Sequence, residues 1–255
     1  ATLDAQWLNY PTRGVPRTSD GKPNLSAPAP RTQDGKPDLS GIWQLEPDAP
    51  CAPGLGCQVD YPVGMEFRNI GAKLPGGLPY QPWAAALVKE RTEQLGKDDP
   101  VGFCKPGGAV RILTYPPYRK FLQLPDLVVI LSERDVTYRQ IFVDGRPLPN
   151  DPNPTFNGYS TGRWDGDALV VQTNGLREGT WLDRNGSPIS GEAKMTERFR
   201  RVSFGRLDVD LTIDDPKAYT KPWTVTLRQR LVVDTELLDY HCTDNEKSAP
   251  HMVGK

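Results

Sequence analysis

The chain has 255 residues, with 31 Lys and Arg against 32 Asp and Glu, so its net charge is close to zero. This balance argues against a nucleic-acid partner, which would favour a basic excess or a basic stripe. The longest aliphatic run, residues 127–131, is far shorter than the roughly 20 residues that span a bilayer, so we expect no transmembrane segment. The hydrophobic fraction of 37% is ordinary for a globular core, and 24 Gly with 26 Pro predict many turns.

Residues 1–40 are predicted to form an extended arm, and residues 41–255 a single domain. Within the arm, residues 17–26 recur as residues 31–40 with eight of ten positions identical, which gives two copies of an Arg-Thr-x-Asp-Gly-Lys-Pro-x-Leu-Ser repeat. Each copy has an Asp-Gly turn, a Pro that forbids helix and one Leu. Two copies are too few for a solenoid. The arm is expected either to run over the surface as a simple leader or to dock on its own barrel or on a partner, which includes self-association.

The first strand is predicted at residues 40–46, where Gly41-Ile42-Trp43 resembles the Gly-x-Trp of lipocalins and the wider calycin group. In that group the Trp closes one end of an up-and-down barrel. Over its whole length the chain also looks like a widespread group of exported bacterial proteins of unknown function. The stretches that carry this second resemblance are residues 34–43, 82–86, 160–164 and 212–223. It implies export and no particular activity.

Four cysteines predict an oxidising compartment. Cys51 and Cys57 bracket a short loop, and Cys104 and Cys242 remain, so we expect disulfides 51–57 and 104–242 among the three possible pairings. Two disulfides would place the protein outside the cytoplasm. A chain that begins at Ala1 is typical of a mature protein after signal-peptide removal. The expected localisation is therefore secreted or periplasmic; four free thiols are the alternative. The cysteine spacing lacks a zinc knuckle, and we expect no metal.

Residues 82–95 are predicted to form the one helix, because Pro82 suits a first turn, apolar residues recur on one stripe and Gly96 stops it. Period-two alternation predicts a hairpin with one buried face at residues 207–213 and 223–233. Further strands are expected at residues 121–124, 127–133, 136–144, 159–164, 168–173, 195–202 and 236–242. Short loops between them favour an all-β fold, an antiparallel up-and-down, calycin-like barrel of about 8–10 strands. A two-sheet β-sandwich is the alternative.

Several motif matches are better explained by ordinary structure. Residues 158–162 match Gly-x-Ser-x-Gly, but the hydrolase motif requires a strand–turn–helix context that this strand region lacks. Neither His241 nor His251 has an obvious carboxylate partner, so a catalytic triad has little support. In residues 183–187, side chains with oxygen atoms stand at alternate positions, as in a calcium-binding loop. An ordinary Asn-Gly turn is the better interpretation of this stretch. Without a phosphate or dinucleotide fingerprint, we expect no cofactor.

The remaining candidates are polar residues that strand parity could place inside a barrel. Glu133 shares a face with Leu127, Val129 and Leu131, and burial among aliphatic side chains would raise its pKa toward that of a general base. Tyr138 and Arg139 would then stabilise developing charge. The alternative is that Glu133 lies in a solvated turn. Candidates for ligand binding are the polar residues Arg163, Asp183 and Glu197, with Trp43, Trp164 and Trp181 as stacking walls.

Three functions are compatible with these patterns. The first is an exported barrel that binds a small apolar or aromatic molecule or a sugar, because the chain has many strands, six Trp and no cofactor motif. The second is a cofactor-independent lyase, isomerase or hydrolase that uses Glu133 as base. The third is a subunit of an extracellular assembly held by the arm.

Overall fold

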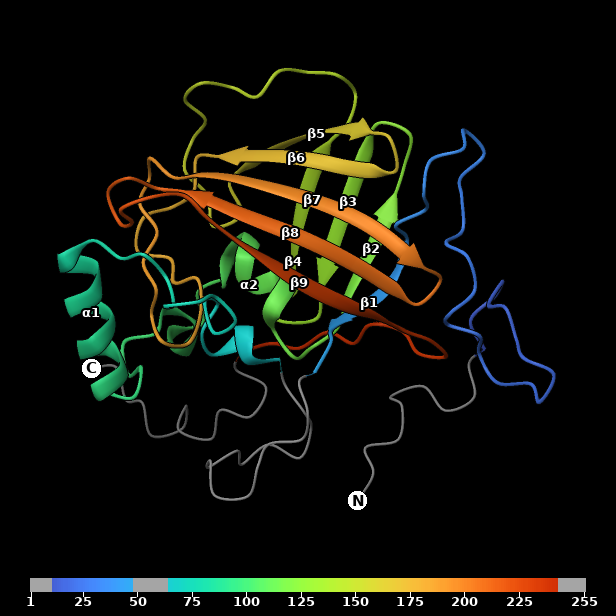
Figure 1. Cartoon of the computed structure of the whole chain (residues 1–255), viewed down its shortest axis with the longest axis horizontal. Helices are drawn as coiled ribbons and strands as arrows, with labels where there is room; N and C mark the ends of the chain where they lie inside the picture. The colour runs from blue at the N-terminus through green and yellow to red at the C-terminus, as the bar shows by residue number, and fades with distance from the viewer. Residues whose placement is uncertain (1–10, 48–63, 243–255) are drawn as a thin grey trace, which may run out of the picture.

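The computed structural model describes residues 11–47 and 64–242, and the strands within these ranges close into one barrel (Figure 1). Neighbours follow the chain order, and the last strand pairs with the first. The strands are β1 (Gly41–Leu45), β2 (Arg119–Gln123), β3 (Leu127–Ser132), β4 (Thr137–Phe142), β5 (Tyr159–Asp165), β6 (Ala168–Asn174), β7 (Lys194–Ser203), β8 (Arg206–Asp214) and β9 (Trp223–Val232). The all-β barrel predicted from alternation is therefore confirmed.

One neighbouring pair departs from the antiparallel expectation. β4 and β5 run parallel and share only two residue pairs, Ile141 with Ser160 and Phe142 with Thr161. The connection between them, residues 143–158, carries four prolines and is too long for a hairpin, so it crosses over the outside of β5 and β6 (Figure 1). Asn174 Nδ2 donates to the Pro149 carbonyl at 2.6 Å and holds this loop down. The barrel therefore has one weakly paired seam.

A predicted tenth strand at residues 236–242 is wrong. This segment forms only an isolated parallel bridge between Tyr240 and Arg134. Because β1 already pairs with β9, the barrel is closed and offers it no strand edge.

The β8–β9 hairpin has the one buried face that its alternation predicts. All four apolar residues of β8 at odd positions, from Leu207 to Ile213, are fully buried. The outward acids of β8 form ion pairs with arginines of β7 and of β8 itself. Asp208 lies 2.8 Å from Arg206 and Asp210 lies 3.1 Å from Arg200, rather than each meeting Arg228 or Arg230 of β9.

Side chains fill the barrel lumen. Phe121 of β2 meets Phe199 of β7 edge to face with ring centroids 5.9 Å apart, which spans the interior. Fully buried inward residues come from every strand: Trp43, Phe121, Ile130, Ile141, Ser160, Leu169, Val171, Met195, Phe199, Leu207, Val209, Leu211 and Leu227. A packed interior of this kind leaves no room for a ligand without rearrangement.

The inward face of β3 is the opposite of the expected one. Val128 and Ile130 are buried in the lumen, whereas Leu127, Val129 and Leu131 point outward and are only partly buried. The odd and the even positions of this strand are both apolar, so alternation does not indicate which set points inward. The register with β2 and β4 decides the face instead.

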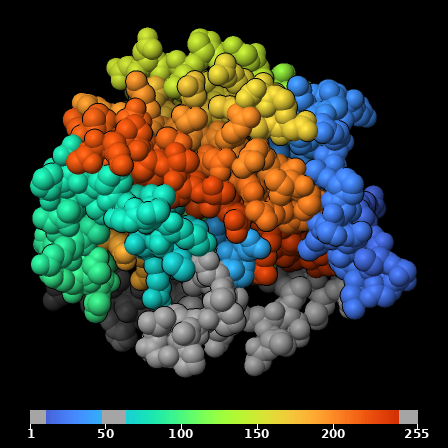
Figure 2. All heavy atoms as spheres, viewed as in Figure 1, coloured from blue at the N-terminus to red at the C-terminus, as the bar shows by residue number. Residues whose placement is uncertain are grey.

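The arm closes one end of the barrel, at the right of Figures 1 and 2. Both repeat copies fold into the same turn, with antiparallel bridges from Arg17 to Pro23 and from Arg31 to Pro37. The second copy is anchored by Arg31, whose guanidinium binds Asp167 with two hydrogen bonds of 3.0 and 2.7 Å. The described part of the arm thus docks on its own barrel.

Within the described ranges, two α-helices and two short 3-10 turns lie toward the other end. They are η1 (Met65–Phe67), α1 (Pro82–Glu93), η2 (Pro100–Phe103) and α2 (Gly108–Thr114). α2 was not predicted, and it is buried along its whole length. The apolar stripe expected on α1 does not pack on the sheet. Only Ala84 of this helix is buried, while Trp83 is 51% exposed and donates from Nε1 to the Lys217 carbonyl.

The predicted disulfide between Cys104 and Cys242 is present, with Cα atoms 5.4 Å apart. It ties the segment after β9 to the turn that follows η2. Cys51 and Cys57, and the pairing predicted for them, lie outside the described residues.

The disulfide closes a long loop, so its removal should weaken the fold. Cys104 and Cys242 are 138 residues apart, for which the chain-entropy account gives up to about 5 kcal/mol of stabilisation. We expect the double variant Cys104→Ala/Cys242→Ala to lose about 2–5 kcal/mol in unfolding free energy, measured by urea denaturation. An unchanged midpoint and slope would show that the bond adds nothing to stability.

Candidate functional site

A buried polar network lies inside the barrel beneath the β4–β5 seam. Arg139 of β4 and Glu197 of β7, 1% and 0% exposed as side chains, form a two-pronged ion pair in which Arg139 Nη1 lies 2.8 Å from Glu197 Oε1. Arg139 Nη2 also donates to Thr173 Oγ1 at 3.0 Å and to Ser160 Oγ at 3.1 Å. The two hydroxyl oxygens are 2.9 Å apart. The network therefore joins four consecutive strands.

Each charged group of this network has its partners within the barrel. Arg139 uses Nε, Nη1 and Nη2, and both carboxylate oxygens of Glu197 accept from it. Such an arrangement satisfies buried charges and leaves neither free for a substrate. Ser160, the central residue of the Gly-x-Ser-x-Gly match, lies within β5 and not on a strand-to-helix elbow. The network thus links four strands through groups whose hydrogen-bonding capacity is used within the barrel.

Glu133 is buried and does not meet the other two residues of the proposed catalytic set. Its carboxylate accepts backbone N–H groups from Tyr118 at 2.8 Å and from Leu238 at 3.0 Å. Burial raises its pKa, against the opposing effect of those two hydrogen bonds. Tyr138 is 61% exposed on the outer wall, whereas its neighbour Arg139 points into the lumen. Glu133 thus holds the segment after β9 against the start of β2.

The ligand-binding candidates also scatter over the molecule. Trp43 is fully buried and donates from Nε1 to the Leu39 carbonyl at 3.0 Å near the arm end. Arg201 lies 4.9 Å from its ring, and burial lowers the pKa of that guanidinium to about 10. Trp164 is partly buried at the end of β5, and Arg163 is exposed on the outer face.

Trp181 and Asp183 belong to a buried turn. The Asp183 carboxylate accepts from Ile70 N at 2.9 Å and from Ser187 N and Oγ at 3.0 and 2.7 Å. Burial raises the pKa of this carboxyl group. Arg91 of α1 covers the Trp181 ring at 4.4 Å. The predicted turn at residues 183–187 is therefore confirmed, since Gly186 N donates to the Asp183 carbonyl.

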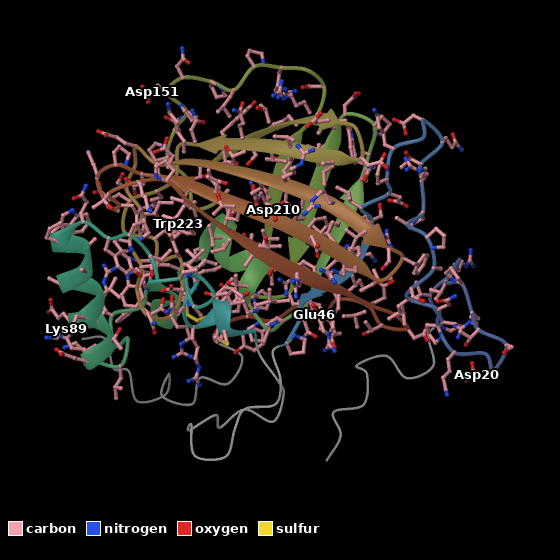
Figure 3. All side chains as sticks on the ribbon, viewed as in Figure 1. Asp20, Glu46, Lys89, Asp151, Asp210 and Trp223 are labelled. Atoms are coloured by element: carbon pink, nitrogen blue, oxygen red, sulfur yellow. A yellow bond between two sulfur atoms is a disulfide. The ribbon has the colours of Figure 1, made fainter. Side chains whose placement is uncertain are left out.

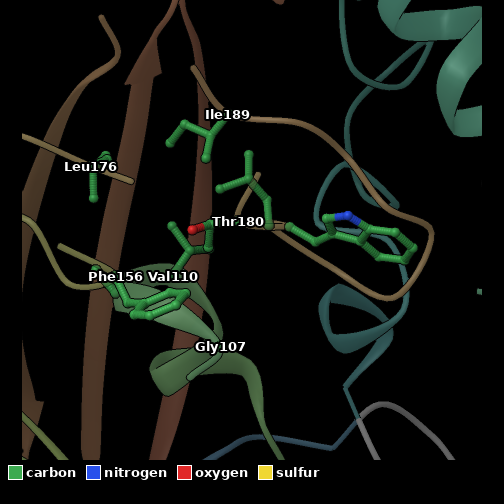
Figure 4. A pocket seen from close by; sticks show the side chains of 9 residues that line it. Gly107, Val110, Phe156, Leu176, Thr180 and Ile189 are labelled. Carbon is green, nitrogen blue, oxygen red and sulfur yellow. The ribbon is translucent and has the colours of Figure 1, made fainter. Parts of the chain in front are cut away.

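A small cavity beside α2 has too little space for an organic ligand. It is lined in part by Val110, Phe156 and Ile189 and has a volume of about 10 Å³ (Figure 4). This space is at the limit for a single water molecule.

A larger, open trough lies where four loop segments meet at one end of the barrel. Its volume is about 540 Å³. The segments are residues 150–154 of the crossover loop, 174–175, 191–194 and 214–216. Asp151, labelled in Figure 3, stands on the crossover loop. Charged and amide side chains line the trough together with three prolines: Asn150, Asp151, Asn174, Glu192, Lys194 and Asp214, with Pro152, Pro154 and Pro216.

Two acids of the trough are available to a ligand. Among the described residues, neither Asp151 nor Asp214 has an ion-pair partner within 4 Å, although Asp214 faces Lys194 in the β7–β8 register. Glu192 is instead held by Lys217 at 2.8 Å. None of the trough-lining residues is among the catalytic or ligand-binding candidates that the sequence indicates. The sequence feature that could indicate this site is the Asp-Pro-Asn-Pro stretch at 151–154, since long proline-rich loops are frequent binding segments.

The fold and this site together define a closed β-barrel protein with a packed lumen and a polar trough at its loop end. Comparison with known protein families finds no match, and comparison with curated proteins finds none either. Within the described ranges, no group of three His, Cys, Asp or Glu side chains is placed to hold a metal ion. No described helix is long and apolar enough to cross a membrane.

The Arg139–Glu197 pair should be far more important to stability than a surface pair. Glu197→Ala leaves Arg139 buried without its counter-ion, so we expect a loss of about 3–5 kcal/mol in unfolding free energy by urea denaturation. The joint replacement Arg139→Met/Glu197→Leu should recover part of that loss. Asp165→Asn, which removes the exposed partner of Arg198, is the control and should cost much less. Equal losses from Glu197→Ala and Asp165→Asn would refute this role.

Glu133 should make stability depend on pH in a defined direction. Because folding raises its pKa above the ordinary value of 4.5, its contribution is complete below that value and is lost as pH rises through the folded pKa. As pH rises from 4.5, we expect the unfolding free energy of the native chain to fall relative to that of the Glu133→Gln variant. Urea denaturation of both proteins at several pH values measures this difference. The exposed control Glu178→Gln should give a flat difference; a flat difference for Glu133→Gln would contradict the assignment.

Proposed function

We propose that this protein is an exported binding protein for a small, hydroxyl-rich molecule such as a sugar, and that the trough is its binding site. The observation that carries the proposal is the open volume of about 540 Å³ at the end of a barrel whose lumen is packed. That volume lies within the ~300–1,000 Å³ typical of small-molecule sites. Loops mounted on a rigid barrel are also where binding residues concentrate.

The lining offers a polar ligand several hydrogen-bonding groups. Carboxylates and amides such as Asp151, Asp214 and Asn174 hydrogen-bond hydroxyl groups, and an ammonium at Lys194 can donate. The rings of Pro152 and Pro216 offer apolar surface to the C–H faces of a sugar. None of the trough-lining residues is aromatic, so stacking on Trp, expected from the sequence, has no part in this site.

The packed lumen weakens the case for an apolar or aromatic ligand. Such a molecule would have to displace side chains like Phe121 and Phe199, which are in contact across the interior. Export is supported by the Cys104–Cys242 disulfide, since such bonds persist in oxidising compartments.

Isothermal titration calorimetry with a panel of neutral, acidic and amino mono- and disaccharides tests the proposal. We expect at least one class to bind at one site per chain. Asp151→Asn and Asp214→Asn should each weaken that binding by roughly 10–100-fold, the effect of losing a charged hydrogen bond. Asp126→Asn, in the β2–β3 turn, is the matched control and should leave affinity unchanged.

Three results would count against this function. One is no heat from any sugar at millimolar concentration, and another is an equal loss of affinity in Asp126→Asn. The third is saturable binding of a hydrophobic dye by the native chain, because it would show that the lumen opens to apolar molecules.

A further inference from the structure

The turn between β3 and β4 holds its backbone in an unfavourable conformation. Asp135 and Val136 adopt left-handed angles, with φ of 60° and 44°. Asp tolerates this region, but a β-branched residue such as Val136 is an outlier in it. Hairpin turns that need left-handed residues usually use Asn, Asp or Gly. The closed turn therefore stores strain that opening would release.

Asp135 also belongs to a buried cluster of polar atoms without hydrogen bonds. Its side chain is 7% exposed, and neither carboxylate oxygen accepts a hydrogen bond from the described chain. Arg134 Nε lies 3.3 Å from Asp135 Oδ1 but makes no hydrogen bond. Arg111 Nε and the Tyr115 hydroxyl, both buried, also lack a hydrogen bond. Because buried polar atoms rarely lack partners, these five atoms make the closed turn costly.

Charged and aromatic groups surround the Asp135 carboxyl group. They come from the turn itself, from α2 and its flanks, and from the segment after β9: Glu133, Arg134, Asp99, Arg111, Tyr115 and Tyr240. Arg111 is already paired with Asp99 through two hydrogen bonds of 2.7 and 3.0 Å. Burial raises the pKa of the Asp135 carboxyl group, because the loss of hydration outweighs the attraction of Arg134 and Arg111.

The closed turn therefore favours a protonated Asp135. A neutral carboxyl group can stay buried at moderate cost, whereas a carboxylate without hydrogen bonds regains its hydration only when the turn opens. Because the pKa in the closed turn lies above the ordinary value of 3.8, the turn has its full stability below that value. It loses stability as pH rises through the raised pKa.

The segment that follows β9 is held by this turn. Leu238 N donates to Glu133 at 3.0 Å, and Tyr240 forms a parallel bridge with Arg134. The Arg134 guanidinium also lies 5.1 Å from the Tyr240 ring. Opening of the turn would break the contacts that dock residues 238–240. The disulfide between Cys104 and Cys242 would still tether the end of the segment.

We propose that Asp135 is a proton-controlled latch for the segment that follows β9. When Asp135 is protonated, the β3–β4 turn stays closed and the segment stays docked. When it is ionised, the turn opens, helped by the strain at Val136, and the segment is released. The disulfide keeps this opening local and reversible. No residue of the latch lines the trough, so the latch is independent of the proposed ligand site.

Hydrogen exchange of the Leu238 amide in the full chain, followed by NMR from about pH 4 to about pH 8, tests the proposal. Comparison of the native chain with Asp135→Asn at each pH cancels the intrinsic pH dependence of exchange. The two proteins should exchange at similar rates at the acidic end. At the upper end the native chain should exchange at least roughly 5-fold faster, because only its turn is opened by ionisation.

Three further measurements control the experiment. Asp126→Asn changes an exposed acid of the neighbouring β2–β3 turn and should exchange at Leu238 like the native chain. Glu133→Gln should speed exchange at every pH, because Leu238 N loses its acceptor. The effect of Asp135→Asn should persist in the Glu133→Gln background. Amides of β8 should stay protected throughout, since the opening is local.

Equal rates for the native chain and Asp135→Asn over the whole pH range would overturn the proposal. A difference that disappears in the Glu133→Gln background would also overturn it, because control would then belong to Glu133. The same holds if Asp126→Asn changes the pH dependence as much as Asp135→Asn does. Loss of protection in β8 with the same pH dependence would show global unfolding in place of a latch.

Discussion

The buried ion pair between Arg139 and Glu197 lies beside the seam of the barrel that has the fewest paired residues. β4 and β5 share only two residue pairs, so backbone hydrogen bonding is weakest at this seam. The side-chain network reaches across it from β4 to Ser160, Thr173 and Glu197 on the next three strands. Desolvated charges are tolerated only when each has its partner, and these partners come together only in the closed barrel. The network therefore favours closure over any opened arrangement of the same strands.

A barrel closed and packed in this way has no space for a ligand in its lumen. The arm covers one end, with Leu39 fully buried there, and α2 lies buried toward the other. Glu133 and the Cys104–Cys242 disulfide then fix the segment that follows β9. What remains open is the surface: the loop trough and the outer walls. Because the interior is packed, a ligand has no space in the lumen, whereas the trough is open to solvent.

The two outer walls have different character, although both belong to one sheet. On β7–β9, arginines and aspartates alternate with buried apolar residues, as expected for a wall that faces water on one side. On β3 the outward positions are aliphatic as well. The barrel wall is therefore polarised around its axis, with aliphatic outward residues on β3 and charged outward residues on β7–β9.

Period-two alternation and turn residues predicted most of the strands from the sequence alone. In each strand of the β8–β9 hairpin, apolar and polar residues alternate, so the sequence itself indicates which side chains are buried. The Cys104–Cys242 pairing also followed from the small number of alternatives. The inward face of β3 did not, since both its parities are apolar and only pairing with β2 and β4 selects one. Arg139 and Glu197 were singled out separately, yet 58 residues part them and only the register brings them together. The trough likewise belongs to tertiary structure, because its four segments are distant in sequence and none shows a periodic pattern that local chemistry could reveal.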